Sequence, residues 1–205
     1  MRAADPADVW WVAEANPISP LYFLPTREWV GALVALIAEL GVKRVLEVGA
    51  GDGFLSQCLQ AAAPQLKVRA TDDDSWSKLE ARLDPASAKA YRGVPFVGIQ
   101  RPAWVERQSA TAAVRATKPD LVLIAWAPPG PMVERAIRGP CRYVLEIGTD
   151  GDVTGDSDRT WKYRKELLEG PIESLGWCRL DGGDRPRQTR VTLYYGARHS
   201  LHGRE

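Results

Sequence analysis

The residues best suited to chemistry are a run of glycines and two acidic residues that each lie at the end of a strand-like segment. The run, VGAGDG at positions 48–53, continues the apolar segment RVLEV, which contains Glu47. Glycines there permit positive φ and leave room for a ligand against the backbone, and the helix that follows begins with unpaired N–H groups. Asp72 ends the next strand-like segment, about 20 residues further on, where a carboxylate can accept hydrogen bonds from both hydroxyls of a ribose. The pattern predicts a site for a nucleoside cofactor.

The order of the glycines and the charge of Glu47 indicate which cofactor this is. A dinucleotide-binding fingerprint is GxGxxG, whereas the order here is GxGxG, followed by Phe54 and Leu55. A carboxylate at position 47 would repel a pyrophosphate, but it suits a ligand that bears an amino group and a sulfonium. We therefore expect S-adenosylmethionine.

These residues come together only if parallel strands are covered by helices. We expect a helix from Thr26 to Leu40, strands at 44–48, 67–71, 104–108, 120–125 and 142–147, helices at 54–62 and near 161–168, and a terminal antiparallel hairpin of 176–180 and 189–195. This alternation predicts an α/β fold, a Rossmann-like doubly wound sheet of seven strands, mostly parallel, with helices on both faces. Residues 1–25, rich in tryptophan and proline, are expected to form an N-terminal arm or lid, and residues 26–205 a single domain.

The glycine run and this order of elements resemble the class I S-adenosylmethionine-dependent methyltransferases, whose first motif is ExGxGxG after the first strand. The resemblance extends from Lys43 to about Tyr195. It implies that Glu47 contacts the methionine amino group, that the glycines pass beneath the cofactor, and that Asp72 or Asp73 holds the ribose. Ser109-Ala110 stands where family members often have Asp-Ala beside the adenine, and a serine hydroxyl can accept the same hydrogen bond. The predicted cofactor-binding residues are Glu47, Gly49, Ala50, Gly51, Gly53, Asp72, Asp73, Trp76, Ser109, Ala110, Ala125 and Trp126.

The methyl acceptor should lie beyond the fourth and fifth strands, because ligands of this architecture bind at the carboxyl ends of the strands. The prolines of WAPPG resemble the [ND]PP[YF] signature of nitrogen methylases, but Ala127 and Gly130 replace the residues that carry its chemistry. Methyl transfer from a sulfonium needs mainly alignment, so a general base is optional. Trp126, Glu146 and Asp150 are the candidate catalytic residues; the Gly/Asp-rich loop around Asp150 is equally consistent with a turn that caps its own backbone.

The composition narrows the class of substrate. The 205 residues have a formal net charge of +1, which provides no general field for a polyanion, so we expect a small-molecule substrate rather than a nucleic acid. The sequence has no apolar run of about 18 residues and no secretory signal, which predicts a cytoplasmic protein with no membrane partner, a monomer or a homodimer. The three cysteines include no CxxC pair, and the two histidines lie near the end of the chain, so we expect reduced thiols and no metal.

Three alternatives stay open. A methyltransferase acting on RNA or protein would use a local basic surface. A non-catalytic binding or scaffold protein could keep the fold without turnover. Aminopropyl transfer or nicotinamide chemistry on the same architecture would need a different acidic pocket or a loop that accepts a pyrophosphate.

Overall fold

The computed structural model describes residues 23–75, 101–127, 130–149, 154, 157–173, 177–178 and 189–199. Its helices are α2 (Arg27–Glu39), α3 (Phe54–Ala62), α6 (Ala110–Thr117), α7 (Met132–Ile137), α8 (Ser157–Thr160) and the short 3-10 helix η2 (Gly170–Ile172). Its strands are β1 (Phe23–Leu24), β2 (Arg44–Val48), β3 (Lys67–Asp72), β4 (Glu106–Arg107), β5 (Leu121–Ala125), β6 (Tyr143–Thr149), β7 (Lys165–Leu167), β8 (Trp177–Cys178) and β9 (Thr189–Tyr195).

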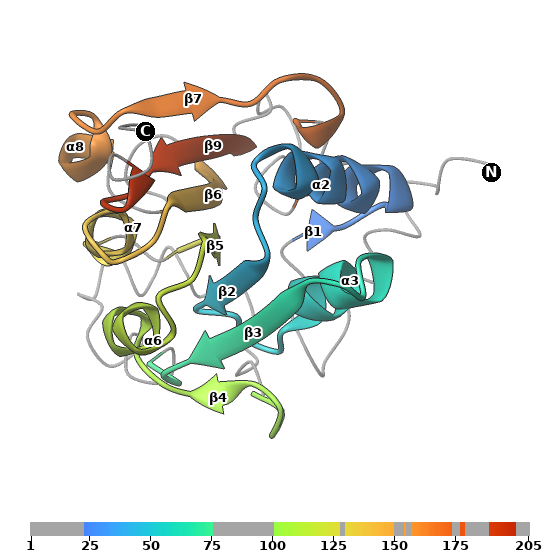
Figure 1. Cartoon of the computed structure of the whole chain (residues 1–205), viewed down its shortest axis with the longest axis horizontal. Helices are drawn as coiled ribbons and strands as arrows, with labels where there is room; N and C mark the ends of the chain where they lie inside the picture. The colour runs from blue at the N-terminus through green and yellow to red at the C-terminus, as the bar shows by residue number, and fades with distance from the viewer. Residues whose placement is uncertain are drawn as a thin grey trace, which may run out of the picture.

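One seven-stranded sheet, in the order β4-β3-β2-β5-β6-β9-β7, runs through the molecule (Figure 1). The pairs from β4 to β6 are parallel, whereas β9 runs antiparallel to both β6 and β7. This is the mostly parallel, Rossmann-like sheet with a C-terminal antiparallel pair that the resemblance implies. The predicted fold class is confirmed.

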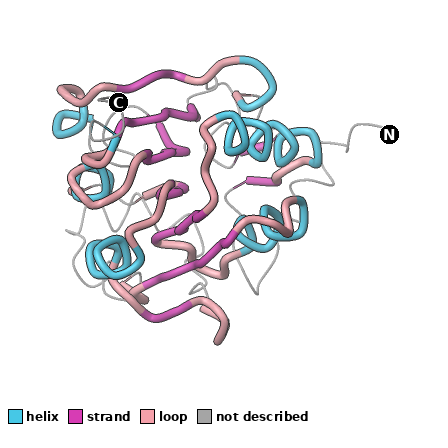
Figure 2. Tube along the Cα trace, in the orientation of Figure 1, coloured by secondary structure: helices cyan, strands magenta, loops and turns pink. Residues whose placement is uncertain are grey.

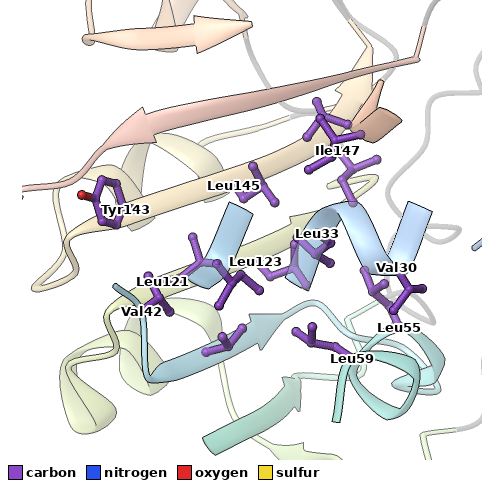
Figure 3. Close-up of a cluster of buried hydrophobic side chains, with 14 of the residues drawn as sticks. Val30, Leu33, Val42, Leu55, Leu59, Leu121, Leu123, Tyr143, Leu145 and Ile147 are labelled. Carbon is purple, nitrogen blue, oxygen red and sulfur yellow. The ribbon is translucent and has the colours of Figure 1, made fainter. Parts of the chain in front are cut away.

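Helices cover both faces of the sheet (Figures 1 and 2), because alternate residues of each central strand point to opposite sides. On one face, Leu121 and Leu123 of β5 pack in a cluster with Leu33 of α2 and Leu59 of α3 (Figure 3). On the other face, Val122 and Ile124 of β5 join a second cluster, which includes Val114 of α6 and Val133 of α7. The central strands are therefore buried on both sides, which explains their nearly continuous apolar sequence.

The first half of the chain folds as its local patterns predict. Thr26 is the N-cap of α2, and its Oγ1 accepts a hydrogen bond from the Trp29 N–H at 3.1 Å. Strand β2 and helix α3 have the predicted bounds, and the predicted strand at 67–71 is one residue longer. The predicted strand at 104–108 shortens to the two residues of β4. No helix in the described ranges is long and apolar enough to cross a bilayer.

The C-terminal third differs from the sequence-based expectation in two places. The predicted helix near 161–168 is wrong, because residues 165–167 form β7 at the edge of the sheet. There the Leu168 N–H donates to the Val191 carbonyl, and the Tyr195 N–H to the Arg164 carbonyl, so strand pairing overrides the helical pattern of KELL. The predicted hairpin partner of β9 is also wrong: β8, within the predicted segment 176–180, pairs with β1, and β9 pairs with β7.

Candidate functional site

The loop between β2 and α3 depends on its glycines. Gly49, Gly51 and Gly53 have φ values of +66°, +57° and +74°, a region that side chains with a Cβ rarely adopt. A Cβ on Gly53 would lie 2.1 Å from Cη2 of Trp104, so the third glycine also lets the Trp104 ring pack against the start of α3. A Cβ on Gly49 would face the sulfur of Met132 at 3.6 Å, across the candidate site.

Most N–H groups of this loop are bound by the protein itself. Between residues 50 and 56, Ala50 donates to the Thr71 carbonyl at 3.0 Å, Gly51 to Asp72 Oδ2 at 2.9 Å, Gly53 to the Ala50 carbonyl at 2.8 Å, Phe54 to Asp52 Oδ1 at 3.0 Å and Ser56 to Glu47 Oε2 at 3.1 Å. In a dinucleotide-binding turn, such N–H groups point at the pyrophosphate. Here side-chain carboxylates and backbone carbonyls already occupy them, so the loop is a poor site for a diphosphate.

Glu47 lies beneath the loop rather than in an open cavity. Its side chain is 3% exposed, and its Oε2 accepts hydrogen bonds from the Ser56 N–H at 3.1 Å and from the Ser56 hydroxyl at 2.5 Å. Burial raises the pKa of Glu47 from 4.5 to about 7, and the two hydrogen bonds from Ser56 partly oppose that rise. The Glu47–Ser56 pair therefore joins the end of β2 to the first turn of α3.

The acidic residues that follow β3 have separate positions. Asp72 is 3% exposed and holds the loop, with its Oδ1 accepting the Asp74 N–H at 2.8 Å; burial raises the pKa of Asp72. Asp73 is exposed and lines the candidate cavities. Asp74, at φ +57°, forms ion pairs with Arg101 at 2.8 Å and Arg107 at 3.3 Å, which tie the turn to the segment around β4.

Two neighbouring cavities lie at the carboxyl ends of the parallel strands. The larger one has a volume of about 880 Å³ and is bordered by Gly49, Asp73, Ser109 and Met132. The smaller one is lined by Gly49, Asp72 and Asp73, together with Ala125 and Trp126. Ligand cavities of proteins commonly measure about 300 to 1,000 Å³, so the larger cavity has room for a nucleoside and more.

Trp126 has a strained backbone at the wall of the smaller cavity. It is 5% exposed and has a φ of +49°, an uncommon value for a residue with a large side chain. Its N–H donates to the Ile147 carbonyl at 2.7 Å, which fixes the turn after β5 against β6. Such outliers persist where the surroundings hold them, and they cluster at functional sites.

The structure brings most of the predicted cofactor residues together. The residues that line one or both cavities are Gly49, Asp72, Asp73, Ser109, Ala110, Ala125 and Trp126, whereas Ala50, Gly51 and Gly53 form the loop and Glu47 lies beneath it. Glu146 is half-buried within β6, between Ile124 and Thr192, and lines neither cavity. Trp76 and Asp150 lie outside the described residues.

Sequence reasoning missed Ser56 and Met132. A hydroxyl in the first turn of the helix after an acidic strand end is a recognisable signal for Ser56, since it can donate to that acid. Met132 belongs to no motif, and only the packing of α7 brings it next to Gly49. Within the described ranges, no group of three metal-ligating side chains is present.

Comparison with known proteins gives matches of structure only. No protein-family model matches the chain. No curated protein sequence matches it either. Among solved structures, the chain is similar to a proposed O-methyltransferase from Klebsiella pneumoniae, with 14% identity, a TM-score of 0.49 and coverage of 96% of this chain and 93% of that one.

Two further structures resemble the chain to a similar degree. The methyltransferase domain of bacterial CtHen1 shares 13% identity at a TM-score of 0.47, with coverage of 82% of this chain and 98% of that one. The 23S rRNA methyltransferase ErmE shares 19% identity at a TM-score of 0.43, with coverage of 85% and 69%. At such values, the fold assignment depends on the strand order of the chain itself.

Proposed function

We propose that this chain is an S-adenosylmethionine-dependent methyltransferase that acts on a small-molecule acceptor at oxygen or nitrogen. The observation that carries the proposal is the state of the glycine loop: its N–H groups are bound by protein acceptors, among them the carboxylates of Glu47 and Asp72. A loop with few free N–H donors and two nearby carboxylates disfavours a diphosphate and favours a neutral or cationic nucleoside. The fold supports the same conclusion, since its strand order is the one that the methyltransferase resemblance implies.

The residues at the cavities fit such a cofactor in type and position. Asp72 and Asp73 follow β3, where carboxylates can accept hydrogen bonds from ribose hydroxyls. Ser109 is the N-cap of α6 but makes no side-chain capping bond, so its hydroxyl is available to an adenine amino group. Gly49 and Met132 border both cavities, so the methionine part can lie alongside them.

When bound, S-adenosylmethionine supplies a methyl group on a cationic sulfonium. The chain's own contribution is to orient the acceptor and exclude water, for which Trp126, Ala125 and Met132 provide an apolar wall. Asp150 stays a candidate base for an acceptor that must lose a proton, whereas Glu146 lines neither cavity. His199 cannot act as this base, because it packs against Tyr143 and Tyr195 at the amino end of β6, whereas the cavities lie at the carboxyl ends of the strands.

Calorimetric titration with S-adenosylmethionine, its demethylated product and NAD tests the proposal. We expect the first two to bind and NAD not to bind. Asp73→Asn should raise the Kd of S-adenosylmethionine about tenfold or more, because hydrogen bonds to charged groups contribute about 1.5–3 kcal/mol. Glu39→Gln removes an exposed carboxylate at the end of α2 and is the matched control, with unchanged affinity. NAD binding without S-adenosylmethionine binding would overturn the proposal.

Turnover separates the enzyme from a binding module with the same fold. Consumption of S-adenosylmethionine over a panel of small phenols, amines and carboxylic acids is expected with at least one class of acceptor. Tight cofactor binding without consumption over that panel, or over RNA and protein acceptors, would assign the chain to the non-catalytic alternative.

A further inference from the structure

The larger cavity extends beyond the candidate cofactor site into the space between α6 and α7. One end is bordered by Gly49, Asp73 and Ser109. The other is lined by Arg115 of α6, by Arg135 of α7 and by Arg138, the C-cap of α7. Helices α6 and α7 lie side by side on the same face of the sheet (Figure 1). We call this second end the arginine groove. We propose that it binds a phosphate or diphosphate group of the methyl acceptor, an assignment of the ligand that rests on the proposed function.

The arginine groove carries positive charge that the described part of the chain does not neutralise. All three arginines are exposed, and none of them takes part in an ion pair formed within the described ranges. The carboxylate of Glu134, which precedes Arg135 on α7, is directed to α8 instead. It lies 3.9 Å from Arg159 and 3.6 Å from Lys162, and it accepts a hydrogen bond from the Tyr163 hydroxyl at 3.1 Å.

The cavity is therefore polarised along its length. Among its described lining residues, Asp73 is the one carboxylate, and it lies at the end that the glycine loop borders. A cavity with charges of opposite sign at its two ends orients a ligand by electrostatic complementarity. A cationic cofactor is favoured beside Asp73, and an anionic group is favoured at the arginines.

Guanidinium groups match the geometry of phosphate, and three of them together suit an anion with more than one negative charge. Their planar N–H donors form paired, charge-assisted hydrogen bonds with phosphate oxygens. Val114, Met132 and Pro140 also line the cavity and provide apolar wall beside the charged residues. These surfaces fit a small molecule whose phosphate binds the arginines and whose nucleophilic atom points towards the glycine loop. An RNA would need basic surface well beyond one bounded cavity, and a net charge of +1 provides little of it.

Calorimetry with inorganic pyrophosphate as the probe tests the arginine groove. The groove variant carries R115Q, R135Q and R138Q, and the matched control carries K43Q, K67Q and K165Q. The control also loses three exposed positive charges, but none of them lines the cavity. At about 0.15 M salt, where distant surface charges are screened, we expect the Kd of pyrophosphate to rise at least tenfold in the groove variant and less than about twofold in the control. R135Q alone should give an intermediate rise and serves if the triple variant folds poorly.

Each other outcome has a defined meaning. Failure of pyrophosphate to bind the unaltered chain, or equal weakening in both triple variants, would overturn the phosphate site. Binding of single-stranded RNA that pyrophosphate does not displace, and that the groove variant loses, would replace it with a nucleic-acid surface. S-adenosylmethionine is titrated in parallel and should bind all variants equally. If it fails to bind while the groove variant still loses pyrophosphate, the phosphate site stands and the methyltransferase proposal fails.

Discussion

At the scale of single residues, Glu47 makes folding stability depend on pH. Its pKa is about 7 in the folded chain and near 4.5 when exposed, so between these values the folded state retains a proton that the unfolded state has lost. The free energy of unfolding therefore falls as the pH rises through this window, by up to about 3 kcal/mol. We expect Glu47→Gln to lose this part of the pH dependence, measured by chemical denaturation at pH values on either side of the window.

Asp72 also has a raised pKa, caused mainly by its own burial, and contributes in the same direction in both the chain and the variant. The difference between their pH profiles therefore reports Glu47. Glu39→Gln, on the surface of α2, should retain the original profile. Identical profiles for Glu47→Gln and the unaltered chain would contradict the burial of an ionisable Glu47.

Gly53 is the residue where the loop tolerates least change. Gly53→Ala should destabilise the chain by about 1–3 kcal/mol, because the new methyl group would overlap the Trp104 ring and because φ is +74°. Thermal or chemical unfolding measures the loss. Gly31→Ala is the control: a Cβ there meets nothing within 4 Å in α2, so the substitution should be neutral or stabilising by up to about 1 kcal/mol. An equal loss in both variants would show that the Trp104 contact is not decisive.

At the scale of elements, the turn after β3 is held by its ion pairs with the segment around β4. Arg101 donates to Asp74 at 2.8 Å and to the Val105 carbonyl. Arg101→Ala should therefore loosen the turn that carries Asp72 and Asp73. If these carboxylates lose about 1 kcal/mol of binding free energy through poorer positioning, the Kd of S-adenosylmethionine should rise about threefold or more. Calorimetric titration of the cofactor is the measurement.

Arg69→Ala provides a matched control for this effect. Arg69 pairs with Glu106 across β3 and β4 at 2.6 Å, but both side chains are about half exposed and neither supports the turn. Exposed pairs contribute little, so cofactor affinity should stay the same. Equal weakening by Arg69→Ala and Arg101→Ala would indicate that β4 as a whole, and not the turn, is being disturbed.

At the scale of the whole molecule, ligand binding at the carboxyl ends of the strands should stabilise the complete sheet. Strand β2 pairs directly with both β3 and β5, and the residues that follow these three strands border the cavities. S-adenosylmethionine at about 100 times its Kd should raise the free energy of unfolding by about 2.7 kcal/mol, and the same concentration of NAD should not. Equal stabilisation by NAD in the variant with R115Q, R135Q and R138Q, which lacks the arginine groove, would contradict the exclusion of a diphosphate from the glycine loop.

The sequence by itself determined the first half of the fold and most of the candidate site. The bounds of β2 and α3 follow from an apolar run, a glycine turn and a helical pattern, all of which act over a few neighbouring residues. Because parallel strands end at the same edge of a sheet, the residues after each predicted strand could also be assigned to one site. That is why Asp72, Ser109 and Trp126 were predicted together.

Tertiary structure decided what depends on distant partners. The segment 165–167 has a helical pattern, yet it forms a strand because β9 offers hydrogen bonds at the sheet edge. Glu47 turns beneath the loop because Ser56 provides two donors there, and the arginine groove exists because α6 and α7, separated by β5, pack side by side. Each of these outcomes depends on which residues the fold brings into contact, or on which of several hydrogen-bond partners a group chooses. Local sequence patterns do not contain that information.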